Sequence, residues 1–167
     1  MSTAKPPNSS GIAFNSSWLW GYAIYRTVYT PESDELWNSA LDKLDRWMNY
    51  RIDAELRIHK EWAQDPYPER VIHESYRNVI IEDKDLLDGA SVDRIRQHFK
   101  KWKETITGEP GEVHFGICSM GRFNACLMVD DRSLKSIVNG IEPGEREFGD
   151  PVGYCTMVDP AYNWVIL

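Results

Sequence analysis

An arginine lies within an aromatic, strand-like segment near the start of the chain. Strict alternation along this segment places Arg26 on the same face as Trp20 and Tyr22. A guanidinium group is costly to bury unless it is paired, because it must give up its hydration. Two interpretations follow. Arg26 binds the carboxylate or phosphate of a ligand, or it forms a structural ion pair with an acid such as Glu82 or Asp83.

The aromatic side chains around this arginine could form a ligand pocket. Ligand sites are mostly apolar and carry a few polar anchors, which is the composition of this segment. Tyr25 projects to the face opposite Arg26, and Trp20 and Tyr22 share its face. The predicted ligand-binding residues are therefore Arg26, Tyr22, Trp20 and Tyr25. The alternative is that the aromatic side chains only pack in the core.

Carboxylates follow several of the predicted strands. If the strand ends meet at one edge of the sheet, these side chains could converge on a hard cation such as Mg²⁺. An aspartate between a strand and a helix is also the residue that caps a helix, and Asp131 is expected to do so. The spacing matches no metal-binding loop, so no metal site is assigned. The residues concerned are Glu82, Asp83, Asp85, Asp130, Asp131 and Asp159.

Sequence motifs that would specify a catalytic centre or a cofactor are absent. The chain contains no G-x-G-x-x-G, no Walker loop and no G-x-S-x-G, and its four histidines lack zinc-binding spacing. Glu112 and His114 lie two residues apart on a predicted strand and could act as an acid–base pair, or simply face solvent. We therefore expect no cofactor, and the sequence leaves open whether the protein is an enzyme.

The charge and the cysteines limit the environment and the partners. With 26 acidic residues against 19 lysines and arginines, the net charge is −7. A field of this sign repels phosphate groups, so we expect no nucleic-acid or membrane partner. The three cysteines form no C-x-x-C pair, and Cys126 and Cys155 lie in apolar segments, which indicates reduced thiols.

The chain is expected to form one domain after a flexible leader. Its length of 167 residues is typical of a single domain. Residues 1–17 are rich in Ser, Pro and Asn and lack the pattern of a signal peptide, so the domain is predicted to span 18–167 and the location to be cytoplasmic. Residues 18–29 are predicted to form a strand that is apolar on both faces, and we expect it to be covered on both sides.

A long amphipathic helix should follow the first strand. Thr30 and Pro31 provide a capping hydroxyl and the residue favoured at the first helical position. The apolar stripe continues towards Trp62, which gives a helix of about 45 Å. The domain should be only roughly 40 Å across. The helix must therefore bend, break near 50–53, or extend beyond the domain as a partner surface.

The remaining elements alternate between strands and helices. They are predicted at 78–83 (strand), 91–106 (helix), 113–118 and 123–129 (a hairpin), 131–139 (helix) and 152–158 (strand). This order favours an α+β fold with an antiparallel or mixed sheet and helices packed on one face, ferredoxin-like or a relative. The alternative is an α/β three-layer sandwich.

Two stretches resemble segments of small uncharacterised proteins from filamentous fungi. They are WGYAIYRTVYTPESD at 20–34 and IEDKDLLDGAS at 81–91. The resemblance implies a fungal protein that is not secreted. It carries over no activity and no site residue.

Two functions of different classes remain. The first is a small-molecule binding domain, or a small enzyme without a cofactor, with an aromatic pocket anchored by Arg26. The second is a protein–protein interaction or homodimerisation module that uses the long helix or the apolar residues 164–167.

Overall fold

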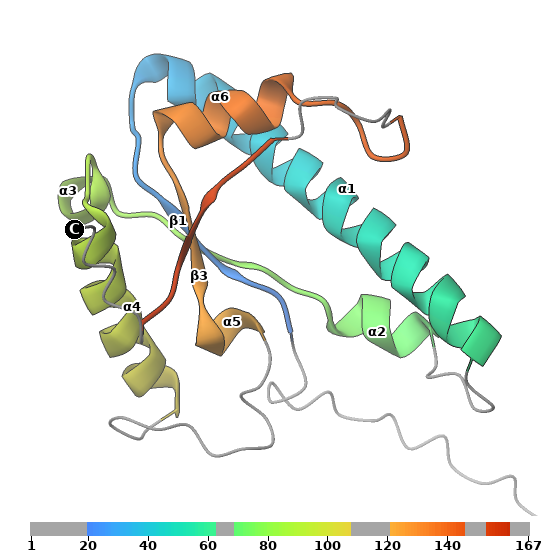
Figure 1. The fold of residues 1–167 in the computed structure, drawn as a ribbon. Helices are drawn as coiled ribbons and strands as arrows, with labels where there is room; N and C mark the ends of the chain where they lie inside the picture. The colour runs from blue at the N-terminus through green and yellow to red at the C-terminus, as the bar shows by residue number, and fades with distance from the viewer. Residues whose placement is uncertain (1–19, 63–68, 108–120, 146–152, 161–167) are drawn as a thin grey trace, which may run out of the picture.

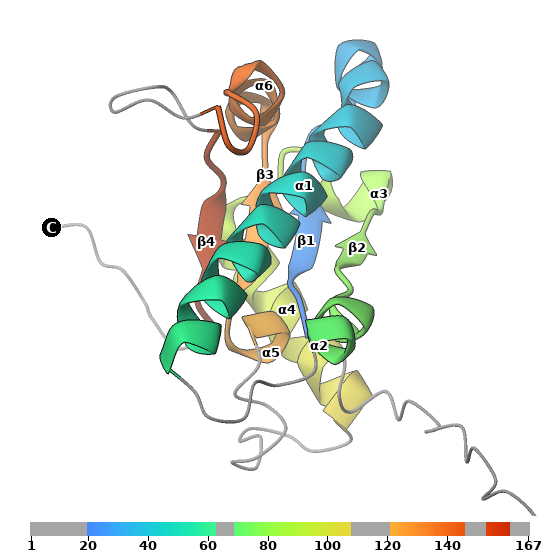
Figure 2. The ribbon, with the colours of Figure 1, turned by 90° about the vertical axis from the view of Figure 1, so that its right-hand side faces the viewer.

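A four-stranded mixed sheet organises the part of the chain that the computed structural model describes, residues 20–62, 69–107, 121–145 and 153–160. The strand order is β2-β1-β3-β4 (Figures 1 and 2). Strand β1 (Ala23–Arg26) is parallel to both β2 (Val79–Ile81) and β3 (Cys126–Val129). Strand β4 (Thr156–Val158) is antiparallel to β3. The predicted mixed sheet is confirmed.

Helices cover both faces of this sheet. Helices α1 (Pro31–Trp62) and α6 (Asp131–Asn139) lie on one face, and α3 (Lys84–Leu87) and α4 (Val92–Thr107) lie on the other (Figure 1). The expectation of helices on one face is therefore wrong, and the ferredoxin-like arrangement is not confirmed. The described residues form three layers because every side chain of β1 is buried, so each face of the strand needs a covering helix.

Alternate residues of β1 pack into two separate hydrophobic cores. Ala23 and Tyr25 pack under α3 and α4, whereas Ile24 packs under α1 and α6. The first core contains Ala23, Tyr25, Leu87, Ala90, Ile95, Phe99, Cys126, Met128 and Val158. The second contains Ile24, Val28, Trp37, Ala40, Leu127, Val129, Leu134 and Ile137. This two-sided packing fixes the direction of each side chain at the end of β1.

Helix α1 is continuous. Thr30 Oγ1 accepts a hydrogen bond from Ser33 N (3.2 Å), which caps the first turn as predicted. The helix runs from Pro31 to Trp62 without a break near 50–53 and is about 48 Å long. Its C-terminal half extends past the strands, beside the short helix α2 (Glu69–Ser75) (Figure 1). Ile52 and Leu56 pack there against Tyr76 in a third apolar cluster.

The predicted hairpin is wrong. Both hydrogen-bonding edges of β3 are occupied, one by β1 and the other by β4, so β3 has no edge for a strand formed by the residues before it. Phe123 belongs to a short helix, α5 (Gly121–Asn124), instead of the strand. The other half of the hairpin, 113–118, lies outside the described residues, as do the predicted leader, 1–17, and the tail, 163–167.

The other elements are confirmed with small changes of length. The strand predicted at 78–83 is β2, the helix predicted at 91–106 is α4, and the helix at 131–139 is α6. The strand predicted at 152–158 is β4, shortened to three residues. In the described part of the chain, none of the helices is both long and apolar enough to cross a membrane.

Candidate functional site

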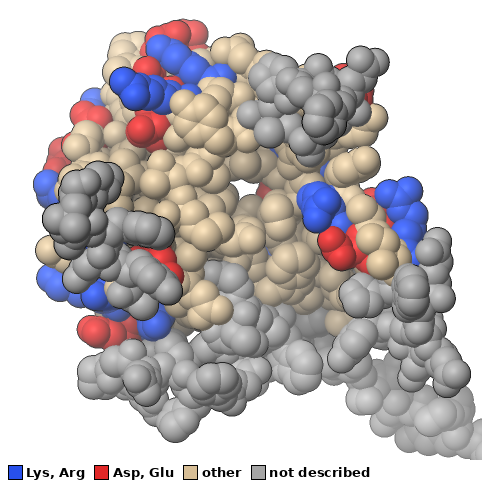
Figure 3. All heavy atoms as spheres, in the orientation of Figure 1, with Lys and Arg blue, Asp and Glu red and all other residues tan. Residues whose placement is uncertain are grey.

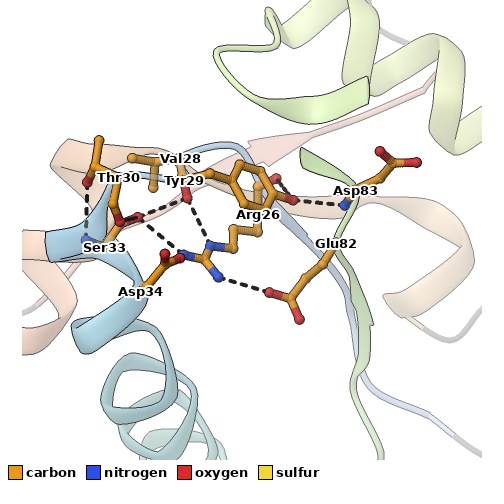
Figure 4. A network of polar contacts seen from close by, with 8 residues as sticks. All are labelled: Arg26, Val28, Tyr29, Thr30, Ser33, Asp34, Glu82 and Asp83. Carbon is orange, nitrogen blue, oxygen red and sulfur yellow. Dashed lines mark hydrogen bonds and ion pairs between the residues drawn. The ribbon is translucent and has the colours of Figure 1, made fainter. Parts of the chain in front are cut away.

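Arg26 lies at the carboxyl end of β1, where its guanidinium group is bound by protein groups (Figure 4). The residue is 7% exposed. Nε donates to Val28 O (2.9 Å), and Nη1 donates to Glu82 Oε1 (3.1 Å). Nη2 donates to Ser33 Oγ (3.2 Å) and to Asp34 Oδ1. Arg26 therefore forms the ion pair with Glu82 that the sequence offered as the structural alternative.

Aromatic rings also contact this guanidinium. Its carbon lies 4.7 Å from the ring centroid of Tyr29 and 5.1 Å from that of Trp37, within the range of cation–π contacts. The Tyr29 hydroxyl donates to Arg26 O (3.2 Å) and accepts from Asp83 N (2.9 Å). Burial raises the pKa of Tyr29. Arg26 thus joins the ends of β1 and β2 to the first turn of α1.

This network lies at a position that often binds ligands in other proteins. The chain leaves β1 towards α1 on one face and leaves β2 towards α3 on the other. In open α/β sheets, ligands bind where neighbouring connections diverge in this way. Here the carboxylates of Asp34 and Glu82 occupy the guanidinium, so a ligand anion would have to replace them.

The structure places the other predicted ligand-binding residues apart from Arg26. Tyr25 is fully buried under α4, and its hydroxyl lies 3.0 Å from His98 Nδ1. Burial, with a smaller contribution from Cys126, raises the pKa of Tyr25. Trp20 belongs to the third cluster, where its Nε1 donates to Ile72 O (3.1 Å).

Tyr22 is the fourth predicted residue and packs at the margin of the second core. Its backbone N donates to Asn78 Oδ1 (3.0 Å). The four predicted side chains therefore lie in different environments and do not form one pocket around Arg26.

The carboxylates at the strand ends act mainly as helix caps and ion-pair partners. Asp83 caps α3 by accepting from Leu86 N (3.0 Å). Asp130, and not Asp131 as expected, caps α6 by accepting from Ser133 N (2.8 Å). Asp130 holds this role because it has the extended backbone of a cap, whereas Asp131 is already the first helical residue.

Metal ligands do not gather in the described part of the chain. No group of three or more His, Cys, Asp or Glu side chains there is arranged to hold a metal ion. The pair Glu112 and His114 lies outside the described residues. Cys126 is buried, and both it and Cys155 are free thiols.

A cleft of about 320 Å³ lies between α1 and the segment that joins α2 to β2. Helix α1 contributes Leu41, Asp45 and Asn49. The facing wall contributes His73, Tyr76, Arg77, Asn78 and Ile80. Figure 3, which views the molecule from the β4 side, shows that the surface is also hollowed between α1 and the sheet. The cleft volume is at the lower end of the range of small-molecule sites.

Hydrogen bonds fix the polar side chains at one end of this cleft. Asp45 Oδ1 accepts from the Tyr76 hydroxyl (3.2 Å) and from Asn78 Nδ2 (2.9 Å). Asn78 Nδ2 also donates to the Tyr76 oxygen (2.6 Å). Burial, and then the Asp45 charge, raise the pKa of Tyr76, so its hydroxyl stays a donor at neutral pH. The Asp45 carboxylate is therefore held in a fixed orientation.

A histidine is fixed in the same way towards the other end. His73 Nδ1 lies 3.2 Å from Asn49 Oδ1, and His73 Nε2 lies 3.0 Å from Asp53 Oδ1. Asn49 Nδ2 in turn donates to Asp45 O (2.8 Å). The cleft is thus lined by side chains that are ordered before any ligand arrives.

The sequence contained a signal for this cleft that our interpretation missed. Asp45, Asn49 and Asp53 recur every four residues, which puts them on one stripe of α1. Lys43, on the same helix, is buried, and its Nζ donates to Val138 O (3.1 Å) at the end of α6. A polar stripe beside the apolar stripe of a helix indicates that this side of the helix faces other polar groups of the protein.

Comparison with known proteins gives no match: the chain matches no protein family model, no curated protein and no solved structure.

Proposed function

We propose that this protein is a small-molecule binding domain and that its site is the cleft between α1 and the α2–β2 segment. The observation that carries the proposal is the ordered polar lining. Asp45, Tyr76 and Asn78 form one set of mutual hydrogen bonds, and Asn49 and His73 form another. Binding sites are concave and hold a few polar groups in place before the ligand arrives, which reduces the entropy lost on binding.

The proposed site lies away from Arg26 and beside the long helix α1. Arg26 is buried and has four of its N–H groups bound within the protein, which supports a structural role. Asp45 and Asn49 are open to the cleft and lie on α1. We assign binding and no reaction. Self-association through α1 stays a prediction.

A fragment screen with a matched pair of variants tests this proposal. Ile80 lines the cleft, and the residue is 36% exposed. Ile80→Trp should narrow the cleft while β2 keeps a residue that strands favour. Ile106, near the end of α4, is 56% exposed, and Ile106→Trp is the control for adding an exposed indole away from the cleft.

The measurement is the thermal midpoint of the wild type and both variants against a library of acids, amines, zwitterions, sugars and aromatic compounds. A ligand at 100 times its dissociation constant stabilises the fold by about 2.7 kcal/mol. This is a rise of about 5 to 10 °C for a chain of this size. We expect compounds that stabilise the wild type and Ile106→Trp but not Ile80→Trp. A screen in which no compound shows this dependence overturns the proposal.

A further inference from the structure

We infer that the cleft binds a small organic amine in its protonated form, an ammonium group on a short apolar body. This inference rests on the proposed function of the cleft and names the class of its ligand. Two observations carry it. The ordered side chains of the lining use their hydrogen-bond donors on one another, and the Asp45 carboxylate keeps an acceptor oxygen and an unbalanced charge.

Tyr76 and Asn78 use their side-chain donors within the protein. The Tyr76 hydroxyl donates to Asp45 Oδ1 (3.2 Å), and it stays protonated at neutral pH because burial raises its pKa. The Asn78 amide has two hydrogens, and it donates to Asp45 Oδ1 (2.9 Å) and to the Tyr76 oxygen (2.6 Å). These two side chains therefore present no further donor to a ligand.

The side chains towards the other end of the cleft follow the same pattern. Asn49 Nδ2 donates to Asp45 O (2.8 Å). Both ring nitrogens of His73 face oxygens of α1, with Nδ1 at 3.2 Å from Asn49 Oδ1 and Nε2 at 3.0 Å from Asp53 Oδ1. Any N–H of this ring is therefore already directed at a protein acceptor. The ordered lining offers a ligand acceptors more than donors.

Asp45 provides both the acceptor and the charge. Its Oδ1 binds the two donors described above, and its Oδ2 accepts no hydrogen bond from the residues that the structure describes. The nearest basic side chains along α1, Lys43 and Arg46, pair with Glu142 instead. The residue is exposed, so a ligand can replace water on Oδ2 without opening a buried ion pair. An ammonium group donates three hydrogens and carries the opposite charge, so it satisfies both properties.

Arg77 also lines the cleft, but it is given no contact with the ligand. Its Nη1 donates to Tyr76 O (2.6 Å), and the residue takes part in further interactions in the molecule. The charge of Arg77 is therefore not available to define a second binding group, and its substitution serves as a control below.

The apolar part of the lining sets the body of the ligand. Leu41 from α1 and Ile80 from β2 contribute hydrocarbon surface on the two sides of the cleft. The volume of about 320 Å³ is small for a ligand site. A short aliphatic chain or a single aromatic ring that carries the ammonium group fits this combination.

Titration calorimetry of the full chain with matched sets of three compounds tests this inference. The compounds of a set share one body, n-butyl, n-hexyl, benzyl or phenethyl, and carry an amine, a hydroxyl or a carboxylate. We expect at least one amine to bind, and its alcohol and acid to bind roughly 10-fold or more weakly, because they lack the charged hydrogen bond to Asp45. An alcohol or acid that binds as tightly as the amine overturns the inference, and so does a lack of binding by every amine.

Substitution of Asp45 should show the same loss. Asp45→Asn removes the charge and keeps an oxygen that accepts from Tyr76 and Asn78, and it should weaken the amine roughly 10-fold or more. Asp42→Asn is the control, because Asp42 is an exposed acid on α1 outside the cleft lining. An unchanged affinity in Asp45→Asn overturns the inference. Thermal unfolding checks that the variants fold, and the comparison of amine with alcohol needs only the wild type.

Arg77→Gln distinguishes an amine site from a site that also binds a carboxylate. The substitution removes a cation from the lining, so the affinity for the amine should stay the same or rise. A loss in Arg77→Gln as large as the loss in Asp45→Asn contradicts the assignment of the ligand to Asp45 alone.

The outcomes separate this inference from the proposed function. If no amine binds but other fragments lose binding in Ile80→Trp, the amine inference fails and the proposed function stands. If no compound depends on Ile80, both fail.

Discussion

Arg26 Nη1 donates to Glu82 Oε1 across the carboxyl ends of two parallel strands, at 3.1 Å and 56 residues apart in sequence. The two side chains differ in environment, because the Arg26 side chain is 8% exposed and the Glu82 side chain 44%. The arginine therefore cannot be rehydrated if its partners are lost, whereas the glutamate can. This difference predicts unequal effects of removing the two charges.

Arg26→Met should destabilise the fold by about 2 to 4 kcal/mol, because it removes the hydrogen bonds and ion pairs that join β1, β2 and α1. Glu82→Gln should cost less than about 1 kcal/mol, because Glu82 is half exposed and an amide oxygen can still accept from Arg26. Urea unfolding of both variants measures the difference. An Arg26→Met protein as stable as the wild type would refute the structural role.

The sequence was informative where local chemistry decides the structure. Apolar residues on both faces of 18–29 predicted a strand covered on both sides, and Thr30 with Pro31 predicted the start of α1. The two-sided cover is confirmed for a shorter strand, Ala23–Arg26, and α1 begins at Pro31, because a strand face and a first helical turn depend on nearby residues. The sequence also offered the ion pair of Arg26 with Glu82 as one of two interpretations, because a buried charge needs a partner.

Long-range pairing explains what the sequence did not predict. The residues around 123–129 suited a hairpin, but β3 pairs with β1 and β4, and sequence distance alone does not reveal such partners. The cleft needs Asp45 of α1 to meet Tyr76 and Asn78, more than 30 residues away. The periodic stripe on α1 showed a polar face, but only the tertiary fold shows what it faces.

Asp130→Ala should destabilise the fold by about 1 kcal/mol, because it removes the side chain that accepts from Ser133 N at the start of α6. Asp131→Ala should destabilise the fold by only roughly 0.3 kcal/mol. It removes an exposed ion pair with Lys135 and a negative charge that interacts favourably with the helix dipole. Thermal unfolding of the two variants compares neighbouring aspartates directly. Equal losses, or a larger loss in Asp131→Ala, would contradict the assignment of the cap.

Gly21→Ala should destabilise the fold by about 3 kcal/mol or more. Gly21 has a φ of +146°, and an added Cβ would lie 2.2 Å from Arg77 O. The backbone cannot move away easily, since hydrogen bonds on both sides hold it. Arg77 N donates to Trp20 O (2.8 Å), and Val79 N donates to Tyr22 O (2.8 Å). Urea unfolding should show the loss.

Gly89→Ala is the matched control for this effect. Gly89 also has a positive φ, +62°, but an added Cβ would meet nothing within 4 Å. The cost should therefore be that of the left-handed backbone alone, about 1 kcal/mol. If both alanine variants lose the same stability, the close approach at Gly21 does not constrain the fold.

The Cys126 thiol should resist alkylation in the folded protein. Cys126 is fully buried between β1 and β4, and burial raises its pKa to about 12, although a backbone hydrogen bond and Arg96 oppose this rise. The reactive species is the thiolate, and at pH 8 only about one thiol in ten thousand is ionised. Burial also shields the sulfur from the reagent.

We expect iodoacetamide at pH 8 to leave the Cys126 peptide unmodified in native protein, as read by peptide mass spectrometry. The same reagent should label it fully in urea, because unfolding restores an ordinary thiol. Labelling at similar rates with and without urea would show that the centre of the sheet opens frequently.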